Sequence, residues 1–252
     1  MNKIVFITGA TSGFGKAAAE KFAANKYDVI ITGRRENLLF ELQKELENNF
    51  GVEVLPLVFD VRERATVTSI ISSIPDKWKQ VDVLLNNAGL ALGRDYFEEA
   101  SLDDWDTMLD TNVKGLLYVS RAVLPFMTAR NKGHIINMGS VAAKDVYEKG
   151  NVYCASKAAV ESISRGMRTD LLRHRIKVTA IHPGAAETEF SLVRFKGDEQ
   201  TAQKIYDGYK PLSAGDVADV IYYCASLPDH VCINDLVLTC TAQADAYYTF
   251  KG

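Results

Sequence analysis

Tyr153 and Lys157 are the residues of this sequence whose types and spacing most directly suggest chemistry. They stand four positions apart in the stretch NVYCASKAAV, so in a helix the phenol and the ammonium project from the same face, about one turn apart. One interpretation is that both are surface residues, whose apolar side-chain atoms cover apolar neighbours while their polar ends stay in water. The other reading is chemical, because a nearby ammonium in a low-dielectric pocket lowers the pKa of a phenol and lets it exchange a proton at neutral pH.

A glycine-rich turn, TGATSGFG at 8–15, follows a short apolar run and precedes a helical pattern. Gly9 permits a tight turn, Gly13 allows close approach of the backbone, and Gly15 lets the helix pack on the strand. The helix N-terminus then presents free N–H groups and a positive dipole end to a pyrophosphate. A plain strand–helix turn also favours glycine, but the position after the first strand of a βαβ unit predicts dinucleotide binding.

Two arginines, Arg34 and Arg35, follow the second expected strand in the segment TGRRENL. About 20 residues beyond the glycines of such folds, an acidic residue binds the ribose 2′-hydroxyl of NAD, whereas an arginine accommodates the 2′-phosphate of NADP. Arg35 stands at that position, and two guanidiniums suit a phosphate dianion. The alternatives are a solvated pair beside the next helix, or Glu36 binding the ribose of NAD. We expect NADP, with NAD as the weaker alternative.

Short apolar runs alternate with amphipathic helical patterns along most of the chain. This alternation predicts one α/β Rossmann domain over 1–252, with a doubly wound parallel sheet and helices on both faces. We expect Pro125 to kink or end part of the long helical stretch 103–130. The interruption at 183–213 predicts a partly helical substrate lid at about 184–212. The expected strands are 3–8, 28–32, 52–59, 81–87, 133–139, 176–184 and 232–238.

The composition is that of an ordinary globular protein, with 47% hydrophobic and 24% charged residues among 252. The net charge is −3 and the signs are mixed, so no basic footprint for nucleic acid or an anionic membrane is present. No apolar stretch approaches the roughly 20 residues that span a bilayer, and the N-terminal apolar run is too short for a signal-peptide core. A cytoplasmic location is therefore expected.

The four cysteines carry no metal or redox signature. They form no C-x-x-C pair and have no histidine at a metal-ligand spacing, so we expect a reduced, metal-free protein in which they are small core residues. Cys154, between Tyr153 and Lys157, would face another side of the helix and is assigned no chemistry. The others are Cys224, Cys232 and Cys240.

An ordered set of motifs over almost the whole chain resembles the short-chain dehydrogenase/reductase family. The motifs are TGATSGFG, NNAG (86–89), Asn112, Ser140, YCASK (153–157) and HPG (182–184). The segments NNAGLALG, GHIIN, GNVY, TEFSLVRFKGD and TAQA are similar to the NADP-dependent 3-hydroxy acid dehydrogenases of that family, which oxidise serine, allo-threonine and related small acids. The resemblance implies a seven-stranded sheet ordered 3-2-1-4-5-6-7. It also implies a homotetramer with the helices near 103–130 and 152–172 at its interfaces.

The resemblance implies a catalytic set of Asn112, Ser140, Tyr153 and Lys157. Tyr153 would be the proton donor and acceptor, Ser140 would donate a hydrogen bond to the substrate oxygen, and Lys157 would bind the nicotinamide ribose. Asn112 would anchor a water that relays protons to Lys157. The structural alternatives are a helix cap for Ser140, a helix kink for Asn112 and a core phenol for Tyr153.

The resemblance also assigns parts of the cofactor to parts of the chain. Asp60 and Val61 would lie near the adenine, Asn87 and Gly89 beside a ribose, and the segment HPGAAETEF at the nicotinamide amide. The predicted cofactor contacts are Gly9, Thr11, Ser12, Gly13, Phe14, Gly15, Arg34, Arg35, Asp60, Val61, Asn87, Ala88, Gly89, Tyr153, Lys157, Pro183, Gly184 and Thr188.

Substrate recognition is predicted at the lid. Arg194 and Lys196 are candidates to receive a carboxylate beside Ser140 and Tyr153, although charged loop residues are also commonly just solvated. Three residues depart from the pattern of the family and bear on the substrate. They are Ala143 in place of a glycine, Val146 in place of a proline and Ala186 in place of a valine.

We therefore expect an NADP-dependent alcohol dehydrogenase that transfers a hydride between NADP(H) and a small 3-hydroxy acid such as serine, allo-threonine or 3-hydroxyisobutyrate. One alternative is a broader carbonyl reductase of the same family that acts on 3-oxoacyl, diketone or pterin substrates. Another is a non-catalytic NADP-binding regulator, in which loss of Tyr153 or Lys157 would be expected. Sugar-nucleotide epimerases share the Tyr–Lys pair but usually carry a larger C-terminal domain.

Overall fold

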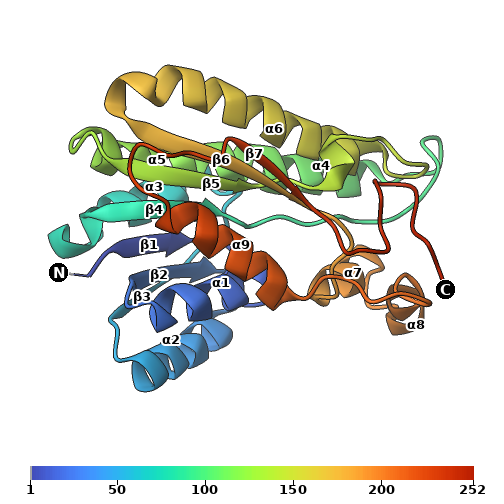
Figure 1. The fold of residues 1–252 in the computed structure, drawn as a ribbon, viewed down its shortest axis with the longest axis horizontal. Coiled ribbons are helices and arrows are strands. Elements are labelled where there is room, and N and C mark those ends of the chain that lie inside the picture. Colours follow the sequence, from blue (N-terminus) through green and yellow to red (C-terminus); the bar gives the residue numbers. More distant parts are fainter. Residues whose placement is uncertain (1) are drawn as a thin grey trace.

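The strands form one parallel sheet, in the computed structural model that describes residues 2–252 (Figure 1). Their order is β3-β2-β1-β4-β5-β6-β7, so the predicted seven-stranded sheet is confirmed. Each strand lies in its expected segment, with ends that agree to within one or two residues except that β7 begins three residues later than expected. They are β1 (Ile4–Ile7), β2 (Asp28–Gly33), β3 (Val54–Val58), β4 (Val81–Asn86), β5 (Gly133–Met138), β6 (Ile176–Pro183) and β7 (Asp235–Leu238).

Helices cover both faces of the sheet and bury two apolar clusters (Figure 1). One face carries α1 (Gly13–Ala24), α2 (Glu36–Phe50) and α9 (Ala214–Ser226). The other face carries α3 (Arg64–Ser72), α5 (Leu116–Thr128) and α6 (Asn151–Leu171). Side chains of the central strands alternate between the two clusters, as Val5 and Phe6 of β1 do. Covering on both faces explains why the strands are nearly continuous in apolar residues.

The long helical stretch is interrupted at a π-helical turn, Asp110–Gly115, which joins α4 (Leu102–Leu109) to α5. The helix does not end at Pro125, because α5 continues through this residue to Thr128. The turn is fixed by tertiary contacts, since Asn112 within it hydrogen-bonds the main chain of Leu90. Such contacts leave no signal in the local sequence.

The glycine turn joins β1 to α1 as predicted. Gly9 and Gly13 have φ of +66° and +50°, values in the left-handed region that favours glycine. A Cβ on Gly15 would lie 2.1 Å from the carbonyl oxygen of Gly9, so only glycine lets α1 begin this close to the strand. The Asn87 side chain ties the same turn to β4 by donating to the carbonyls of Thr8 and Gly9 at 2.9 and 3.0 Å.

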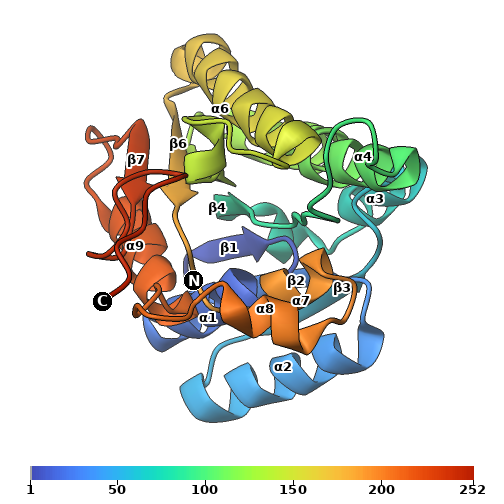
Figure 2. The same ribbon diagram turned by 90° about the vertical axis from the view of Figure 1, so that its right-hand side faces the viewer.

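The segment 184–212 lies at the carboxyl edge of the sheet and contains α7 (Glu189–Arg194) and α8 (Glu199–Lys204) (Figure 2). Its two ends meet, because the main chain of Leu212 exchanges hydrogen bonds with Ala185 and Glu187. The C-terminal residues run along the same edge, where Gly252 bonds to Gly208. The segment is therefore a closed, partly helical loop on the side where parallel sheets bind ligands.

None of the helices in residues 2–252 is long and apolar enough to cross a membrane. This same part of the chain holds no group of three or more His, Cys, Asp or Glu arranged for a metal ion. Its four cysteines are free, and all but the half-buried Cys232 are buried.

Replacing Gly15 by alanine should lower the free energy of unfolding by about 2 kcal/mol or more, because the added methyl meets the Gly9 carbonyl. Gly166→Ala is the matched control, since an added methyl there meets nothing within 4 Å and α6 should gain about 0.5–1 kcal/mol. Urea unfolding of both variants measures the two effects. A Gly15→Ala protein as stable as the wild type would contradict this packing.

Candidate functional site

Two adjoining cavities lie at the carboxyl edge, and Gly139 and Tyr153 sit where they meet. The first, of about 330 Å³, is lined by the glycine turn, the ends of β2 to β4 and part of α7. The second, of about 820 Å³, is lined by Ser140, Tyr153, the 184–212 segment and the C-terminal residues. Tyr153 borders both. The arrangement suits a dinucleotide in the first cavity with its reactive end directed toward the second.

The predicted cofactor residues converge on the first cavity. All of them line it except Pro183 and Gly184, which line the second cavity, and Gly15, which packs behind the turn. The side chain of Ser12 makes no capping bond to α1, so the first N–H groups of that helix remain free for a pyrophosphate. The residues present therefore fit a dinucleotide.

Arg34 and Arg35 line this cavity where β2 ends. Arg35 donates to the Thr11 hydroxyl from Nε at 3.1 Å and from Nη2 at 2.9 Å, and its Nη1 lies 3.0 Å from Oε2 of Glu189 on α7. Arg34 is more exposed and lies 3.8 Å from the Asp60 carboxylate. Arg35 is thus oriented by neighbours on two elements, which suits a specific contact with a phosphate.

Tyr153 and Lys157 occupy one buried face of α6. Both side chains are less than a tenth exposed, and Nζ of Lys157 lies 5.9 Å from the Tyr153 ring centre. Lys157 donates to the Met138 carbonyl at the end of β5, at 2.9 Å. Phe190 of α7 packs on Tyr153 with ring centres 5.7 Å apart. The pair is therefore enclosed, and the surface reading of these residues is wrong.

The pKa of each member of this pair is moved toward the neutral form. Burial raises the pKa of Tyr153 above its ordinary value, although Ser140 and Arg194 act in the opposite direction. Burial lowers the pKa of Lys157 to about 8. The expected lowering of the Tyr153 pKa by Lys157 is therefore not found, because burial, which disfavours the phenolate, is the largest influence on this group.

Asn112 lies beside Lys157 because of the π-helical turn. Its Oδ1 accepts from the Leu90 N–H at 2.8 Å, and its Nδ2 donates to the Leu90 carbonyl and to Ser156 of α6. A Cβ added to Gly89 would lie 3.2 Å from this Oδ1 and 3.4 Å from Nζ of Lys157. Asn112 therefore joins the loop after β4 to the helix of the Tyr–Lys pair.

Ser140 caps a short 3-10 turn, Val141–Ala143, by accepting from the Ala142 N–H at 3.1 Å. The capping alternative is therefore correct, and the hydroxyl also lines the second cavity. Beneath it lies the imidazole of His182, which is fully buried. Its Nδ1 is 3.4 Å from the Ser140 nitrogen, and its Nε2 is 2.7 Å from an Asp235 carboxylate oxygen.

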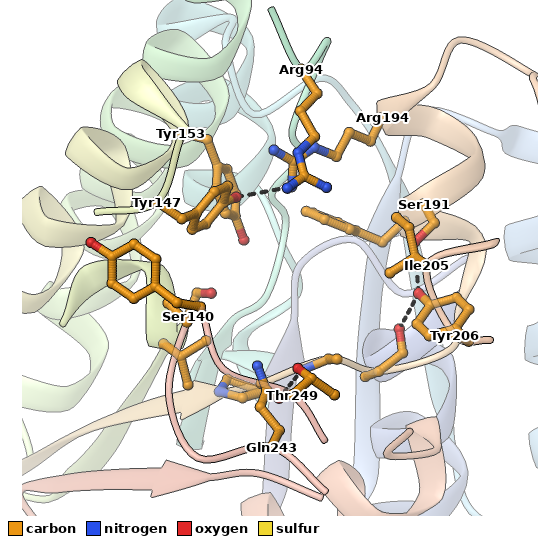
Figure 3. Close-up of a pocket in the computed structure, with 18 of the residues that line it drawn as sticks. Arg94, Ser140, Tyr147, Tyr153, Ser191, Arg194, Ile205, Tyr206, Gln243 and Thr249 are labelled. Atoms are coloured by element: carbon orange, nitrogen blue, oxygen red, sulfur yellow. Dashed lines mark hydrogen bonds between the residues drawn. The ribbon is translucent and has the colours of Figure 1, made fainter. Parts of the chain in front are cut away.

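Arg194 lies beside Tyr153 in the second cavity, whereas Lys196 does not line that cavity. The Arg194 side chain is 9% exposed and lines the second cavity, with its Cζ 5.5 Å from the Tyr153 ring centre (Figure 3). It donates to the Gly93 carbonyl and to the Tyr147 hydroxyl, at 3.3 and 2.9 Å. Lys196 turns away and pairs with Asp104 at 2.8 Å, so its expected role as a carboxylate partner is wrong.

Several residues of the second cavity have no counterpart in the sequence-based prediction. Tyr147 and Arg94 stand beside Arg194, and Gln243 accepts from the Ala185 N–H at 2.7 Å (Figure 3). Each lies in an irregular segment, where no periodicity indicates the direction of a side chain. Of the three residues that depart from the family pattern, Ala186 lines this cavity and Val146 is largely exposed.

The depressed pKa of Lys157 predicts a specific pH dependence of stability. Between about pH 8, where the folded lysine loses its proton, and its ordinary value of 10.5, the unfolded chain binds more protons, so stability rises with pH. Relative to Lys157→Met, the wild type should gain up to about 3 kcal/mol across this interval. Urea unfolding of both proteins at several pH values measures the difference, and parallel curves would contradict the burial of the charge.

The chain matches the short chain dehydrogenase family over residues 3–198. NADP-dependent 3-hydroxy acid dehydrogenase YdfG of Salmonella typhi is 48% identical over 244 residues, which cover 96% of this chain and 97% of that protein. Sulfoacetaldehyde reductase 2 of Chromohalobacter salexigens is 46% identical over 245 residues, covering 97% and 96%. The solved closed form of serine dehydrogenase complexed with NADP+ has a TM-score of 0.92 at 44% identity, and the match covers 99% of both chains.

The family match covers more than half of the chain, and the relatives match it along nearly their whole length. The sheet order and the glycine turn of this protein agree with that match. The resemblance of the sequence is thereby confirmed, and the chain belongs to the short chain dehydrogenase family.

Proposed function

We propose that the protein is an NADP-dependent dehydrogenase of small 3-hydroxy acids, acting on the hydroxyl or, in reverse, on the carbonyl. One observation carries the proposal: the buried guanidinium of Arg194 lies 5.5 Å from the ring of Tyr153. A group that binds an acid and a group that exchanges a proton thus border the same cavity. The names of the similar proteins support it, since they describe a 3-hydroxy acid dehydrogenase and a serine dehydrogenase with NADP+.

NADP, when bound, would accept the hydride from the alcohol carbon or return it to a carbonyl. Tyr153 takes the hydroxyl proton in the oxidative direction and donates it in the reductive one. Ser140 donates a hydrogen bond to the same substrate oxygen, which stabilises the charge that develops there. Lys157 binds the cofactor ribose, and Asn112 holds a water beside it. These are the roles that we propose for the four catalytic residues.

The proposed cofactor is NADP because Arg35 is fixed by Thr11 and Glu189 at the adenosine end of its cavity. Arg34 beside it supplies a second positive charge. Glu36, the alternative partner for the ribose of NAD, begins α2 and does not line either cavity formed by residues 2–252. The remaining cofactor contacts are proposed as the sequence predicts them.

The proposed substrate is a small acid because Arg194 is nearly dry and bonds only neutral oxygens, on Gly93 and Tyr147, within residues 2–252. A buried cation with neutral partners favours an anionic ligand. This argues against a general carbonyl reductase for uncharged diketones or pterins. The intact set of Asn112, Ser140, Tyr153 and Lys157 argues against a non-catalytic regulator.

The segment 184–212 is proposed as the substrate lid, since Phe190 covers Tyr153 and Glu189 reaches Arg35. We also propose a homotetramer, because Leu102, Leu109 and Leu117 expose apolar surface along α4 and α5, where the family is expected to form its interfaces. A cytoplasmic location stays a prediction from the sequence.

The function is tested by following NADPH formation with L-serine, L-allo-threonine and 3-hydroxyisobutyrate, each with NADP and with NAD. We expect turnover with at least one acid and a strong preference for NADP. Tyr153→Phe should lower kcat by at least about 100-fold, because the proton donor is lost, while NADPH still binds with its ordinary affinity. Reduction of a diketone by NADPH without turnover of any acid would overturn the proposed substrate class.

A further inference from the structure

Two arginines, not one, face the anion-binding end of the second cavity. The Cζ atoms of Arg194 and Arg94 lie 5.5 and 5.9 Å from the centre of the Tyr147 ring, and their side chains converge beside it (Figure 3). Arg194 comes from α7, whereas Arg94 comes from the loop after β4. Within residues 2–252, neither guanidinium has a carboxylate within 4.0 Å, and Arg94 makes no hydrogen bond to a side chain. Both therefore keep donors for a ligand.

The charge of the cavity supports an anion at this place. Its charged lining consists of five basic residues and one acidic residue, namely Arg94, Lys149, Arg194, Lys204 and Lys251 against Glu148. Glu148 is engaged by the Tyr96 hydroxyl at 3.2 Å. An excess of positive charge around a partly enclosed volume attracts anionic ligands and raises their local concentration.

The donors also suggest the shape of the anion. Tyr147 accepts a hydrogen bond from Nη1 of Arg194, so its own hydroxyl proton remains free to donate. Arg194, Arg94 and Tyr147 thus offer donors from three separate groups. A planar carboxylate has two oxygens, which one guanidinium can occupy in a bidentate pair. A tetrahedral acid group such as a sulfonate has three oxygens and matches three donor groups.

We propose that Arg94 determines which acid group the enzyme accepts, and that Arg94, Arg194 and Tyr147 together bind a tetrahedral sulfonate better than a carboxylate. The proposal rests on the proposed function and specifies its substrate class. The reaction is unchanged: the alcohol carbon gives its hydride to NADP+, the hydroxyl proton passes to Tyr153, and an aldehyde or ketone forms. The acid group takes no part in the bonds that change.

The test compares three alcohols with the same reacting carbon, namely 2-hydroxyethanesulfonate, 3-hydroxypropionate and the uncharged 3-hydroxypropionamide. Wild-type kcat/KM should fall in that order. Arg94→Gln should raise KM for the sulfonate by about 10-fold or more and for the carboxylate only about 2- to 3-fold, with the amide unchanged. Lys149→Gln removes one charge from the same cavity and serves as the control, and it should leave the ratio of sulfonate to carboxylate unchanged.

Turnover of the carboxylate without turnover of the sulfonate would overturn this proposal and leave the proposed function intact. So would an Arg94→Gln enzyme with an unchanged ratio of the two KM values. Arg94→Lys keeps the positive charge but loses the forked donors of the guanidinium. If this variant had the wild-type ratio of the two KM values, charge alone would explain the preference, and the proposal would also be overturned. Failure of both acids, with a diketone still reduced, would instead overturn the proposed function.

A separate observation concerns the buried residues under Ser140. His182 is wholly inaccessible, and a Cβ on Gly139 would lie 2.4 Å from its Nδ1, so the ring fills the space directly below the Ser140 main chain. Nε2 of His182 is 2.7 Å from an Asp235 carboxylate oxygen, and Nδ1 faces the Ser140 main chain, 3.4 Å from its nitrogen and 3.2 Å from its carbonyl oxygen. Asp235 in turn pairs with Lys144 at 2.7 Å.

The same chain of contacts reaches the helix of the Tyr–Lys pair. Lys144 also pairs with Glu161 of α6 at 3.0 Å, one turn beyond Lys157. The network of His182, Asp235, Lys144 and Glu161 therefore links β6, β7, the turn after Ser140 and α6. We infer that His182 is a positioning residue, which holds Ser140 at the distance from Tyr153 that a shared substrate oxygen requires.

A double-mutant cycle tests this role. His182→Asn should lower kcat about 10-fold in the wild-type background but less than about 2-fold when Ser140 is already alanine, because the histidine acts through the serine. KM for NADP should not change in either background. Asp235→Asn should lower kcat in the same Ser140-dependent way, but by a smaller factor. Because Asp235 is half-exposed, this variant provides the test even if a His182 variant does not fold. Equal losses in both backgrounds would show a general structural role and overturn the inference.

Discussion

The positive charge of Lys157 in a nearly dry interior is the constraint on which the rest of the site depends. Its ammonium donates to the carbonyl of Met138, the last residue of β5. That bond forms only when α6 lies across the carboxyl edge of the sheet. The glycine turn, Asn87 and Ser140 leave the sheet at the same edge. The hydrogen bond that satisfies the Lys157 ammonium thus brings Tyr153 together with the two cavities.

A buried polar network holds α6 in this position. Asn86 at the end of β4 donates to Asn137 of β5 and to Ser120 of α5, both at 2.8 Å, and Asn137 donates to Ser164 of α6 at 2.9 Å. These side chains are fully or almost fully buried. A helix that slid along the sheet would leave them without partners, at a cost of about 1–3 kcal/mol for each group. The network therefore fixes the position of α6 along the sheet, which apolar contacts alone would not specify.

Features set by local rules were predictable from the sequence. The strands follow from apolar runs, Gly15 from the strand–helix turn, and the shared face of Tyr153 and Lys157 from helical spacing. Features set by distant contacts were not. The π-helical turn depends on the bonds between Asn112 and Leu90, and the direction of Lys196 depends on Asp104, 92 positions earlier in the numbering. The pKa of Tyr153 depends on enclosure by Phe190 and the rest of the cavity, which no spacing reveals.

The π-helical turn, Asp110–Gly115, also limits how this part of the chain can change during evolution. A π turn holds more residues than an α turn, and each residue of an α-helix advances it by about 100°. Deleting one residue here would restore regular geometry but rotate α4 against α5, so that Asn112 and the buried Met108 could not both keep their places. Surface helices elsewhere can lose or gain a residue at their ends. The stretch from α4 to α5 can change by substitution, but its length is fixed by the contacts that its own buried residues make.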